Sequence, residues 1–287
     1  GIVLDNNNTT ADAVIRANDI TLYGSGQQGI RISELLPVTA YEVTANNLTI
    51  SGTGNRGIWA VSGGNNAFSD NQITIEPHSQ DVYNWCIKDD GSHANSYQCN
   101  ALYGSTNPES RPIYGLSLRN SSEANVQCNS IYGNTYGLQF WGMGLDADIR
   151  GNAFLYSNTG LYYGLYPSQG DAFSGEQRHH GNTWANGTFA DEGAEHLSQL
   201  QSIVDKSLYL VDPSINQNLS TQETAVIDWI RNDNGNGTTY SCIQNGIDLC
   251  GSNGNGGTGT GSNYSGGSLG SSLAAGIASG NIYTGSY

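Results

Sequence analysis

Few residues of this chain are charged, and few of those are basic. Charged side chains make up 12% of the 287 residues, and 10 Lys and Arg oppose 25 Asp and Glu, which gives a formal net charge of -15. A field of that sign repels phosphate backbones and anionic membrane surfaces, so we expect no nucleic-acid partner. The sequence also lacks an apolar run of about 18 residues, so we expect no membrane-spanning helix.

Motifs that mark common cofactor sites are missing as well. There is no phosphate-binding loop and no cysteine or histidine pair at zinc spacing. We therefore expect no metal and no cofactor, with Ca²⁺ alone left open. The chain instead holds 39 Gly together with 17 Tyr and five Trp. Because these large rings can stack into a core, the sequence does not belong to the disordered class.

Two short patterns recur along the chain. A Gly followed by an aliphatic residue stands at positions 29, 57, 115, 137 and 160. The second pattern is Asn-x-apolar, whose sites lie 23 (152 − 129) to 30 (182 − 152) residues apart: Asn18, Asn46, Asn71, Asn100, Asn129, Asn152 and Asn182. Patterns that return once per block indicate a repeat protein. Each block reads as two or three short alternating strands, which can bury their apolar row only by stacking on a neighbour.

This repeat predicts an all-β fold, a right-handed parallel β-helix. A β-sandwich would explain the strands but not the return of both patterns in every block, and a leucine-rich repeat would need more Leu. Successive coils of a β-helix lie about 4.8 Å apart. The seven asparagines are therefore predicted to form an internal ladder, in which each side-chain amide bonds to those above and below it.

The chain divides into three predicted parts. Residues 1–184 are expected to form the coils, and because Gly1 and Ile2 already follow the repeat pattern, we expect further coils upstream. Residues 185–250 are predicted to be a small cap with short helices, one of them after a capping box at Ser220–Glu223. Residues 251–287 have the composition of a Gly/Ser-rich linker, which we expect to be held by packing.

The five cysteines favour an oxidising, extracellular compartment. Cys242 and Cys250 flank a short loop and are predicted to pair. Cys99 and Cys128 each precede a ladder asparagine by one residue, so they are expected to lie one above the other, within bridging reach. Cys86 competes for Cys99, and its pairing stays open.

A candidate catalytic set lies in the least regular part of the repeat: Lys88, Asp89, Asp90, His93 and Arg111. Enzymes that cleave acidic polysaccharides need paired carboxylates, or carboxylates that hold calcium beside a basic residue. The structural alternative for the same residues is a polar turn with Asx geometry.

A dense aromatic group gives the candidate glycan contacts, Trp141, Tyr162, Tyr163 and Tyr166. Rings that face outward are suited to stacking on sugars, whereas packing between coils is the structural alternative. In the same region Asp146, Asp148 and Arg150 alternate in sequence, and we expect them to form a solvated, ion-paired patch.

The succession of motifs resembles a known family. The segments Gly137-Leu138-Gln139-Phe140, Gly151-Asn152-Ala153-Phe154 and Gly181-Asn182-Thr183-Trp184 look like the β-helix regions of large secreted surface proteins of Bacteroidetes-type bacteria. The chain is also similar in shape to pectate-lyase-like proteins, although their catalytic Asp, Lys and Arg patterns do not map onto it. The resemblance covers roughly residues 15–250. It implies a location at the bacterial cell surface, reached by type IX secretion.

These observations predict an extracellular β-solenoid segment of a larger bacterial surface or secreted protein. Its expected role is structural or adhesive, with contacts to glycans and without catalysis, and its expected partners are the rest of the same polypeptide or a surface assembly. The alternative from another class is a polysaccharide lyase or glycoside hydrolase acting in a groove around residues 88–93. Convergence of Asp89, Asp90, His93 and Arg111 in space would distinguish the second from the first.

Overall fold

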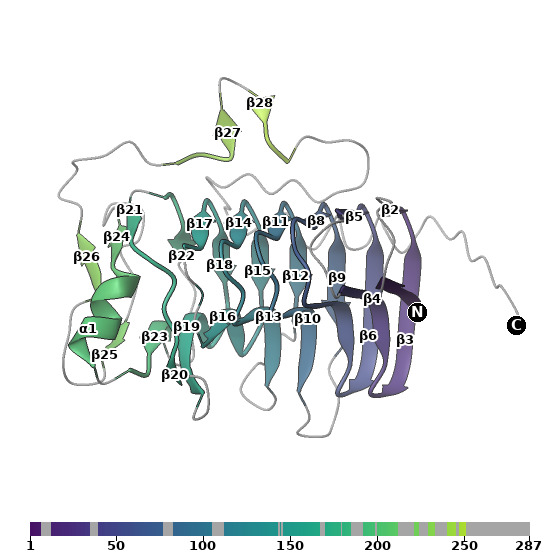
Figure 1. Ribbon diagram of the computed structural model, residues 1–287, viewed down its shortest axis with the longest axis horizontal. Coiled ribbons are helices and arrows are strands. Elements are labelled where there is room, and N and C mark those ends of the chain that lie inside the picture. The colour runs from purple at the N-terminus through teal and green to yellow at the C-terminus, as the bar shows by residue number, and fades with distance from the viewer. Residues whose placement is uncertain are drawn as a thin grey trace, which may run out of the picture.

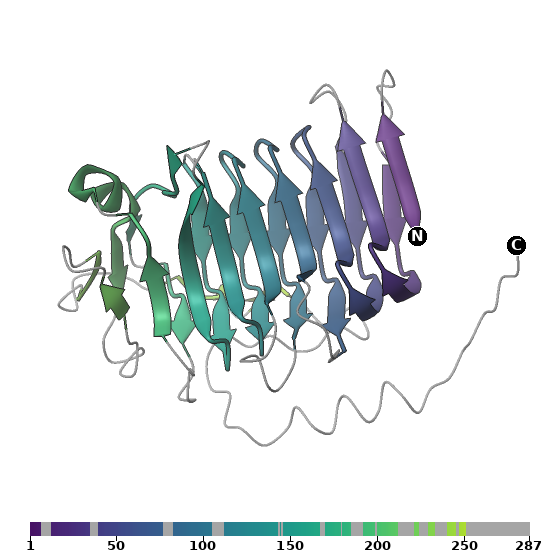
Figure 2. The same cartoon turned by 90° about the horizontal axis from the view of Figure 1, so that it is seen from below.

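A computed structural model shows a rod of stacked β-strand coils (Figure 1), and the view at right angles shows the same stacking (Figure 2). The structure describes residues 1–6, 13–34, 40–76, 83–104, 112–142, 144, 146–166, 170–178, 180–184, 192–198, 200–211, 221–223, 229–232, 240–244 and 247–250. The predicted linker at 251–287 lies outside these residues.

Three sheets run along the rod. Sheet A contains β1 (Ile2–Asn6), β4 (Gln28–Glu34), β7 (Arg56–Val61), β10 (Asn84–Asp90), β13 (Ile113–Arg119), β16 (Tyr136–Trp141), β19 (Thr159–Tyr166), β23 (Glu192–His196) and β25 (Thr221–Glu223), with β20 (Gly170–Asp171) antiparallel to β19. Sheet B contains β2 (Ala13–Arg16), β5 (Tyr41–Thr44), β8 (Ala67–Ser69), β11 (Ser96–Gln98), β14 (Asn125–Gln127) and β17 (Asp148–Arg150). Sheet C contains β3 (Asp19–Ser25), β6 (Asn47–Thr53), β9 (Gln72–Ile75), β12 (Ala101–Tyr103), β15 (Ser130–Tyr132), β18 (Ala153–Leu155) and β22 (Thr183–Trp184).

The strands of each sheet are contributed in turn by successive coils. Each coil visits sheet A, then sheet B, then sheet C, and the next coil begins again in sheet A, so neighbours in a sheet pair in parallel. This order confirms the predicted all-β parallel solenoid. The right-handed sense of the coil remains a prediction.

The inward rows of the sheets form one continuous core. In sheet A the row that follows the motif glycine is fully buried, and its members pair in register: Ile30, Ile58, Ile87, Leu116, Leu138 and Leu161. The glycine itself is required by the closeness of the next coil. A Cβ added to Gly115 would lie 2.5 Å from the carbonyl oxygen of Gly137.

The asparagine ladder runs between sheets B and C from Asn18 to Asn182. At every step one side chain donates from Nδ2 to Oδ1 of the next asparagine, over 2.8 to 3.0 Å. The backbone N–H of the donor residue bonds to the same oxygen, as in the step from Asn71 to Asn100. Since each buried amide is satisfied by its neighbours, the ladder fixes the register of the coils.

The residue before each ladder asparagine turns the corner between sheets B and C. It adopts the left-handed backbone conformation, with φ between 53° and 62°: Ala17, Ala45, Asp70, Cys99, Cys128, Gly151 and Gly181. Glycine is favoured in this region of φ, and the other residue types tolerate it at a cost. The two cysteines therefore stand at corners of adjacent coils.

The cysteine pairing differs from the predicted one. Cys99 is bonded to Cys250, with their Cα atoms 5.3 Å apart, and Cys128 is bonded to Cys242, with their Cα atoms 5.8 Å apart. Both predicted pairs, Cys99 with Cys128 and Cys242 with Cys250, are therefore wrong. The reason is that the C-terminal segment runs back along the rod, which brings Cys250 next to Cys99 and Cys242 next to Cys128. Cys86 is a free, buried thiol.

Parallel pairing continues beyond residue 184. β23 pairs with β19 and β25 pairs with β23, while β21 (Gln177–Arg178), β24 (Tyr209–Val211) and β26 (Ile230–Asn232) form a further parallel sheet.

The predicted capping box is wrong, because Thr221–Glu223 is a strand. Helix is limited, among the described residues, to α1 (Gln201–Val204) and the 3₁₀ turn Asp205–Ser207. An antiparallel hairpin, β27 (Ile243–Gln244) and β28 (Ile247–Asp248), follows.

Candidate functional site

The candidate catalytic residues of β10 lie on opposite sides of the sheet. Successive side chains of a strand alternate, so Asp89 faces the core and is fully buried, in the row that Ala60 and Leu118 occupy on neighbouring coils. Lys88 and Asp90 lie on the outer face instead, and their side chains form an ion pair.

His93 does not complete a catalytic centre with them. The Nδ1 atom of His93 lies 2.9 Å from the hydroxyl of Ser122, and its Nε2 atom lies 3.7 Å from a carboxylate oxygen of Glu123. Arg111 lies outside the described residues. The convergence of Asp89, Asp90 and His93 that would have supported the enzyme alternative is therefore not found.

Asp89 is instead part of a polar cluster inside the rod. The Tyr97 hydroxyl donates a short hydrogen bond to its Oδ2 atom, and the Asn95 side-chain amide donates to the same atom over 3.2 Å. Burial raises the pKa of the Asp89 carboxyl, against the opposing hydrogen bonds from Ser92 and Tyr97. These contacts give the carboxyl a structural role in the core.

The outer face of sheet A gathers basic and aromatic side chains. We call the following set the basic-aromatic face: Arg31, Arg56, Trp59, Trp85, Lys88, Asp90, Tyr114, Arg119, Tyr136 and Tyr162. Strand register places its members in adjacent rows, in which Arg56, Trp85 and Tyr114 follow one another from coil to coil. Four of the 10 Lys and Arg of a chain with net charge -15 are gathered here, against one carboxylate in the set.

Asp90 is held from three sides. Its Oδ2 atom accepts a hydrogen bond from Trp59 Nε1 over 2.8 Å and lies 2.8 Å from Lys88 Nζ, while its Oδ1 atom lies 2.9 Å from Arg119 Nε. The Asp90 side chain is 5% exposed and that of Arg119 38%. Burial lowers the pKa of the Lys88 ammonium, and the hydrogen bond and charge of Asp90 oppose this effect. One carboxylate thus holds two cations and orients one indole.

Arg31 and Arg56 have a different environment. The Arg56 guanidinium lies 4.4 Å from the ring centre of Trp59 and 5.1 Å from that of Trp85, and the Arg31 guanidinium lies 5.1 Å from Trp59. Their Nε atoms are buried and have no hydrogen-bond partner in the part of the chain that the structure describes. Within that part, neither arginine has a carboxylate at ion-pair distance. The indole rings therefore position two cations that form no ion pair among the described residues, although the charge of Asp90 acts on Arg56 and opposes the lowering of its pKa by burial.

The aromatic members of the face stack along the rod. Ring centres of Trp85 and Tyr114 are 5.5 Å apart with planes 12° from parallel, and those of Tyr114 and Tyr136 are 5.4 Å apart at 17°. Tyr162, which stands in the adjacent row next to Gln139, packs against Tyr136 with ring centres 4.3 Å apart. Because stacked rings cover one another's faces, these residues present at most ring edges to the outside, and Tyr114 and Tyr162 are only 6% and 7% exposed. They are better suited to hydrogen bonding and to positioning cations than to broad stacking on a sugar.

The predicted glycan contacts are divided between surface and core. Tyr162 and Trp141 belong to sheet A's outer rows, with ring centres 6.4 Å apart. Tyr163 points inward, is fully buried, and its hydroxyl lies 3.0 Å from that of Tyr209, so its prediction as a glycan contact is wrong. The side chain of Tyr166 lies outside the described residues.

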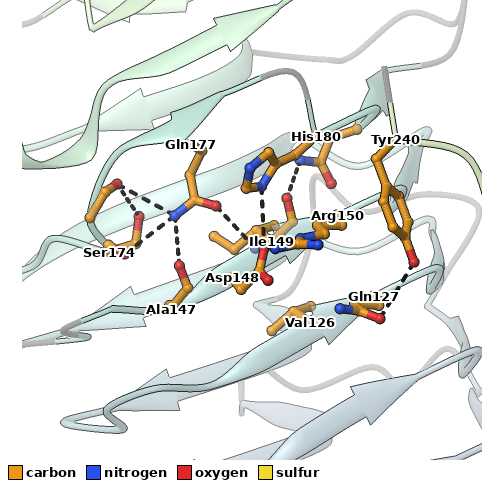
Figure 3. Close-up of polar contacts among 12 residues, drawn as sticks. Val126, Gln127, Ala147, Asp148, Ile149, Arg150, Ser174, Gln177, His180 and Tyr240 are labelled. Carbon is orange, nitrogen blue, oxygen red and sulfur yellow. Dashed lines mark hydrogen bonds and ion pairs between the residues drawn. The ribbon is translucent and has the colours of Figure 1, made fainter. Parts of the chain in front are cut away.

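The predicted ion-paired patch is present on sheet B (Figure 3). Asp148 Oδ1 lies 2.5 Å from Arg150 Nε and 3.3 Å from His180 Nδ1. Burial alone would raise the pKa of the Asp148 carboxyl, but hydrogen bonds from His180 and Arg150 hold it below its usual value. Asp146 stands before the strand in a left-handed turn and is not part of the alternation. Tyr240 of the C-terminal segment lies beside this patch, with its ring centre 5.6 Å from the Arg150 guanidinium.

Arg31, Arg56, Trp59, Trp85 and Tyr114 were not identified as site residues from the sequence. The sequence nevertheless contained a signal that could have identified these five residues. The residue before each motif glycine and the residue two after it both face outward, so aligning the coils on that glycine places all five in two adjacent rows. The absence of a Gly at Cys86 obscures this alignment in the central coil.

Comparison with protein-family models, with curated proteins and with solved structures finds no match to this chain. The fold therefore rests on strand pairing, and the family resemblance rests on repeat motifs. Among the described residues, no helix is long and apolar enough to cross a membrane, and no group of three or more His, Cys, Asp or Glu is arranged to hold a metal ion.

Proposed function

We propose that the chain is an extracellular, non-catalytic β-solenoid of a bacterial surface or secreted protein, and that its basic-aromatic face binds an acidic glycan. The observation that carries the proposal is the pair Arg31 and Arg56, two cations fixed over indole rings that form no ion pair among the described residues. Such pre-positioned guanidinium groups lose little side-chain freedom when a carboxylate or sulfate arrives, and they bind it by charge-assisted hydrogen bonds.

The surroundings favour a glycan over other anionic polymers. Duplex DNA carries one charge per about 1.7 Å, and the net charge of -15 opposes so dense an anion. An acidic polysaccharide is more sparsely charged and carries hydroxyl groups, which suit the partly exposed ring of Tyr136. Coils about 4.8 Å apart also distribute the cationic and aromatic residues along the length of an extended ligand. The two disulfides support a location outside the cytoplasm.

Binding to defined polysaccharides tests the proposal. We expect polygalacturonate or alginate to bind the purified chain and to quench the fluorescence of Trp59 and Trp85, with an affinity that falls as salt is raised. A neutral galactan should bind at least about tenfold more weakly, which is a difference of roughly 1.4 kcal/mol. Equal binding of neutral and acidic polymers, or no binding of either at low salt, would contradict the proposal.

A charge-matched pair of variants locates the site. Arg31→Ala with Arg56→Ala removes two cations from the face and should weaken acidic-glycan binding by about 10- to 100-fold. Arg16→Ala with Lys206→Ala removes the same charge from other surfaces and should change affinity by less than about twofold. Similar losses for both pairs would show that net charge, and not this face, controls binding.

The same incubations address the catalytic alternative. Lys88, Asp90 and Arg119 do converge, and this cluster is the observation that bears on a lyase or hydrolase. On the present proposal the polymers keep their length, measured by reducing ends and by chromatography. Depolymerisation that is lost in Asp90→Asn would replace the binding role with an enzymatic one.

A further inference from the structure

The two disulfides are nested in the sequence. The outer bond joins Cys99 to Cys250, 151 residues apart, and the inner bond joins Cys128 to Cys242, 114 residues apart. Both bonds connect corner residues of adjacent coils to one short C-terminal segment, residues 240–244 and 247–250, which we call the strap. In Figure 1 the strap hairpin β27–β28 lies over the rod beside the strands of sheet B, and the bonds tie it there.

The corner residues that precede successive ladder asparagines, here Gly181, Gly151, Cys128 and Cys99, form a column along which the strap packs. A Cβ added to Gly181 would lie 2.0 Å from the carbonyl oxygen of Tyr240, and one added to Gly151 would lie 2.5 Å from the sulfur of Cys242. Glycine thus stands where the strap backbone passes closest, and cysteine stands on the next two coils, Cys128 and Cys99. Tyr240 also packs on Arg150 of the ion-paired patch. The strap therefore follows the column backwards, from the coil of Gly181 to that of Cys99.

We propose that the strap is a mechanical shunt, which carries a pull applied to the C-terminal end directly to the middle of the rod. The argument is covalent. A force applied beyond Cys250 passes through its disulfide to Cys99, so the chain between these two residues bears no tension while the bond is intact. The protected part includes Tyr114, Arg119 and Tyr136 of the basic-aromatic face.

A shunt matters particularly in a solenoid. Each coil contacts only its neighbours, so a pull on the terminal coil can peel coils away one at a time. With the outer bond closed, coils between Cys99 and the strap cannot be peeled from the C-terminal end. The free thiol of Cys86 does not threaten the arrangement, because it is fully buried and burial raises its pKa, which suppresses the thiolate needed for exchange.

Single-molecule stretching between the two ends of the chain tests the proposal. Reductant should add about 500–540 Å to the fully extended length, because 151 residues at about 3.3–3.6 Å each become available. In Cys99→Ser with Cys250→Ser the inner bond alone remains, and the gain on reduction should fall to about 380–410 Å for 114 residues.

The nesting supplies a matched control. Cys128→Ser with Cys242→Ser removes as many sulfurs but keeps the outer bond, so its length gain should equal that of the unmodified chain. A gain about a quarter of the predicted one would indicate pairing of sequence neighbours, Cys99 with Cys128 and Cys242 with Cys250, and would overturn the proposal. Equal extension with and without reductant would overturn it too. Peptide mapping of the oxidised chain provides an independent readout of the pairing if a variant folds poorly.

Discussion

The asparagine ladder and the basic-aromatic face are both rows of side chains that cross the coils, but they are built differently. The ladder repeats one residue type from Asn18 to Asn182, and its members make the same bonds at each step. In one row of the face the residue type changes from Arg56 to Trp85 to Tyr114.

The difference shows in which rows the coil spacing requires one residue type to repeat and in which rows the residue type can vary. A buried amide row has to repeat, because each member satisfies donors and acceptors one coil away. An outer row does not have to repeat one residue type. The row of Lys88 continues with Ser117 and Gln139, and the strands still pair in register. A row that repeats thus reports the fold. A row that changes, while its members still contact one another, is a candidate for binding.

The largest effect should come from breaking the ladder in its middle. Asn100→Ala removes the acceptor of Asn71 and the donors to Asn129 Oδ1 and to the carbonyl of Phe68. Because these groups are buried, we expect a loss of about 4 kcal/mol in the free energy of unfolding. Urea denaturation followed by circular dichroism measures it.

Asn47→Ala is the matched control for that change. Asn47 follows a ladder asparagine directly, but its side chain is exposed and donates to Asp19 over 3.1 Å. Its replacement should cost less than about 0.5 kcal/mol. If the two variants lose similar stability, the ladder is not what holds the coils in register.

A smaller effect on stability should come from the buried carboxyl of Asp89. Burial raises its pKa, so the folded chain holds the proton more tightly than the unfolded chain does. Below the unfolded-state pKa of about 3.9 both states are protonated. Above it the unfolded state ionises first, so the free energy of unfolding falls as pH rises, until the folded carboxyl ionises as well.

Asp89→Asn should flatten this part of the pH dependence, measured by urea denaturation across a pH series. Glu42→Gln, which changes an exposed carboxyl on sheet B, is the control and should leave the slope as it is. An unchanged slope in Asp89→Asn would show that Asp89 does not control it. Glu34, whose pKa is also raised by burial, retains its own contribution in both variants.

The fold could be predicted from the sequence because its main constraint repeats. Asn and Gly recur at the spacing of one coil, and the coil spacing itself requires them. The burial of Asp89 could not be predicted from a repeated residue type. An acidic residue beside Asp90 and Lys88 is typical of a surface turn, and Asp89 faces the core only because side chains alternate along the strand. The disulfides could not be predicted because sequence distance favours neighbours, whereas the path of the strap decides the partners.

The candidate site was predicted in part for a related reason. Lys88, Asp90 and Tyr162 were found because they stand in dense polar or aromatic stretches. Arg31 and Arg56 stand singly in their own coils, and their significance appears only when the coils are stacked. An outer row without a repeated residue leaves no periodic signal for a sequence argument to follow.

Asp90→Asn should alter the face without breaking it. The Asp90 carboxylate occupies the position between Lys88 and Arg119 that an acidic ligand would seek. Removing its charge should raise the affinity for polygalacturonate about threefold, which isothermal titration can measure. Asp5→Asn, at the N-terminal end of the same sheet, should have a smaller effect. A loss of affinity in Asp90→Asn would mean that orienting Trp59 and Lys88 matters more than freeing the cations.

The smallest expected effect compares two exposed tyrosines on different faces. Tyr83 is 50% exposed and lies 6.0 Å from Trp85 and 5.7 Å from Tyr114, measured between ring centres, whereas Tyr23 is 74% exposed on sheet C. Neither is a core residue, so each change to Ala should alter the free energy of unfolding by less than about 0.5 kcal/mol. Tyr83→Ala should nevertheless weaken acidic-glycan binding about twofold, because an exposed ring at the edge of the face adds contact area, and Tyr23→Ala should leave affinity unchanged. Equal affinities in the two variants would confine the binding surface to the rows of sheet A itself.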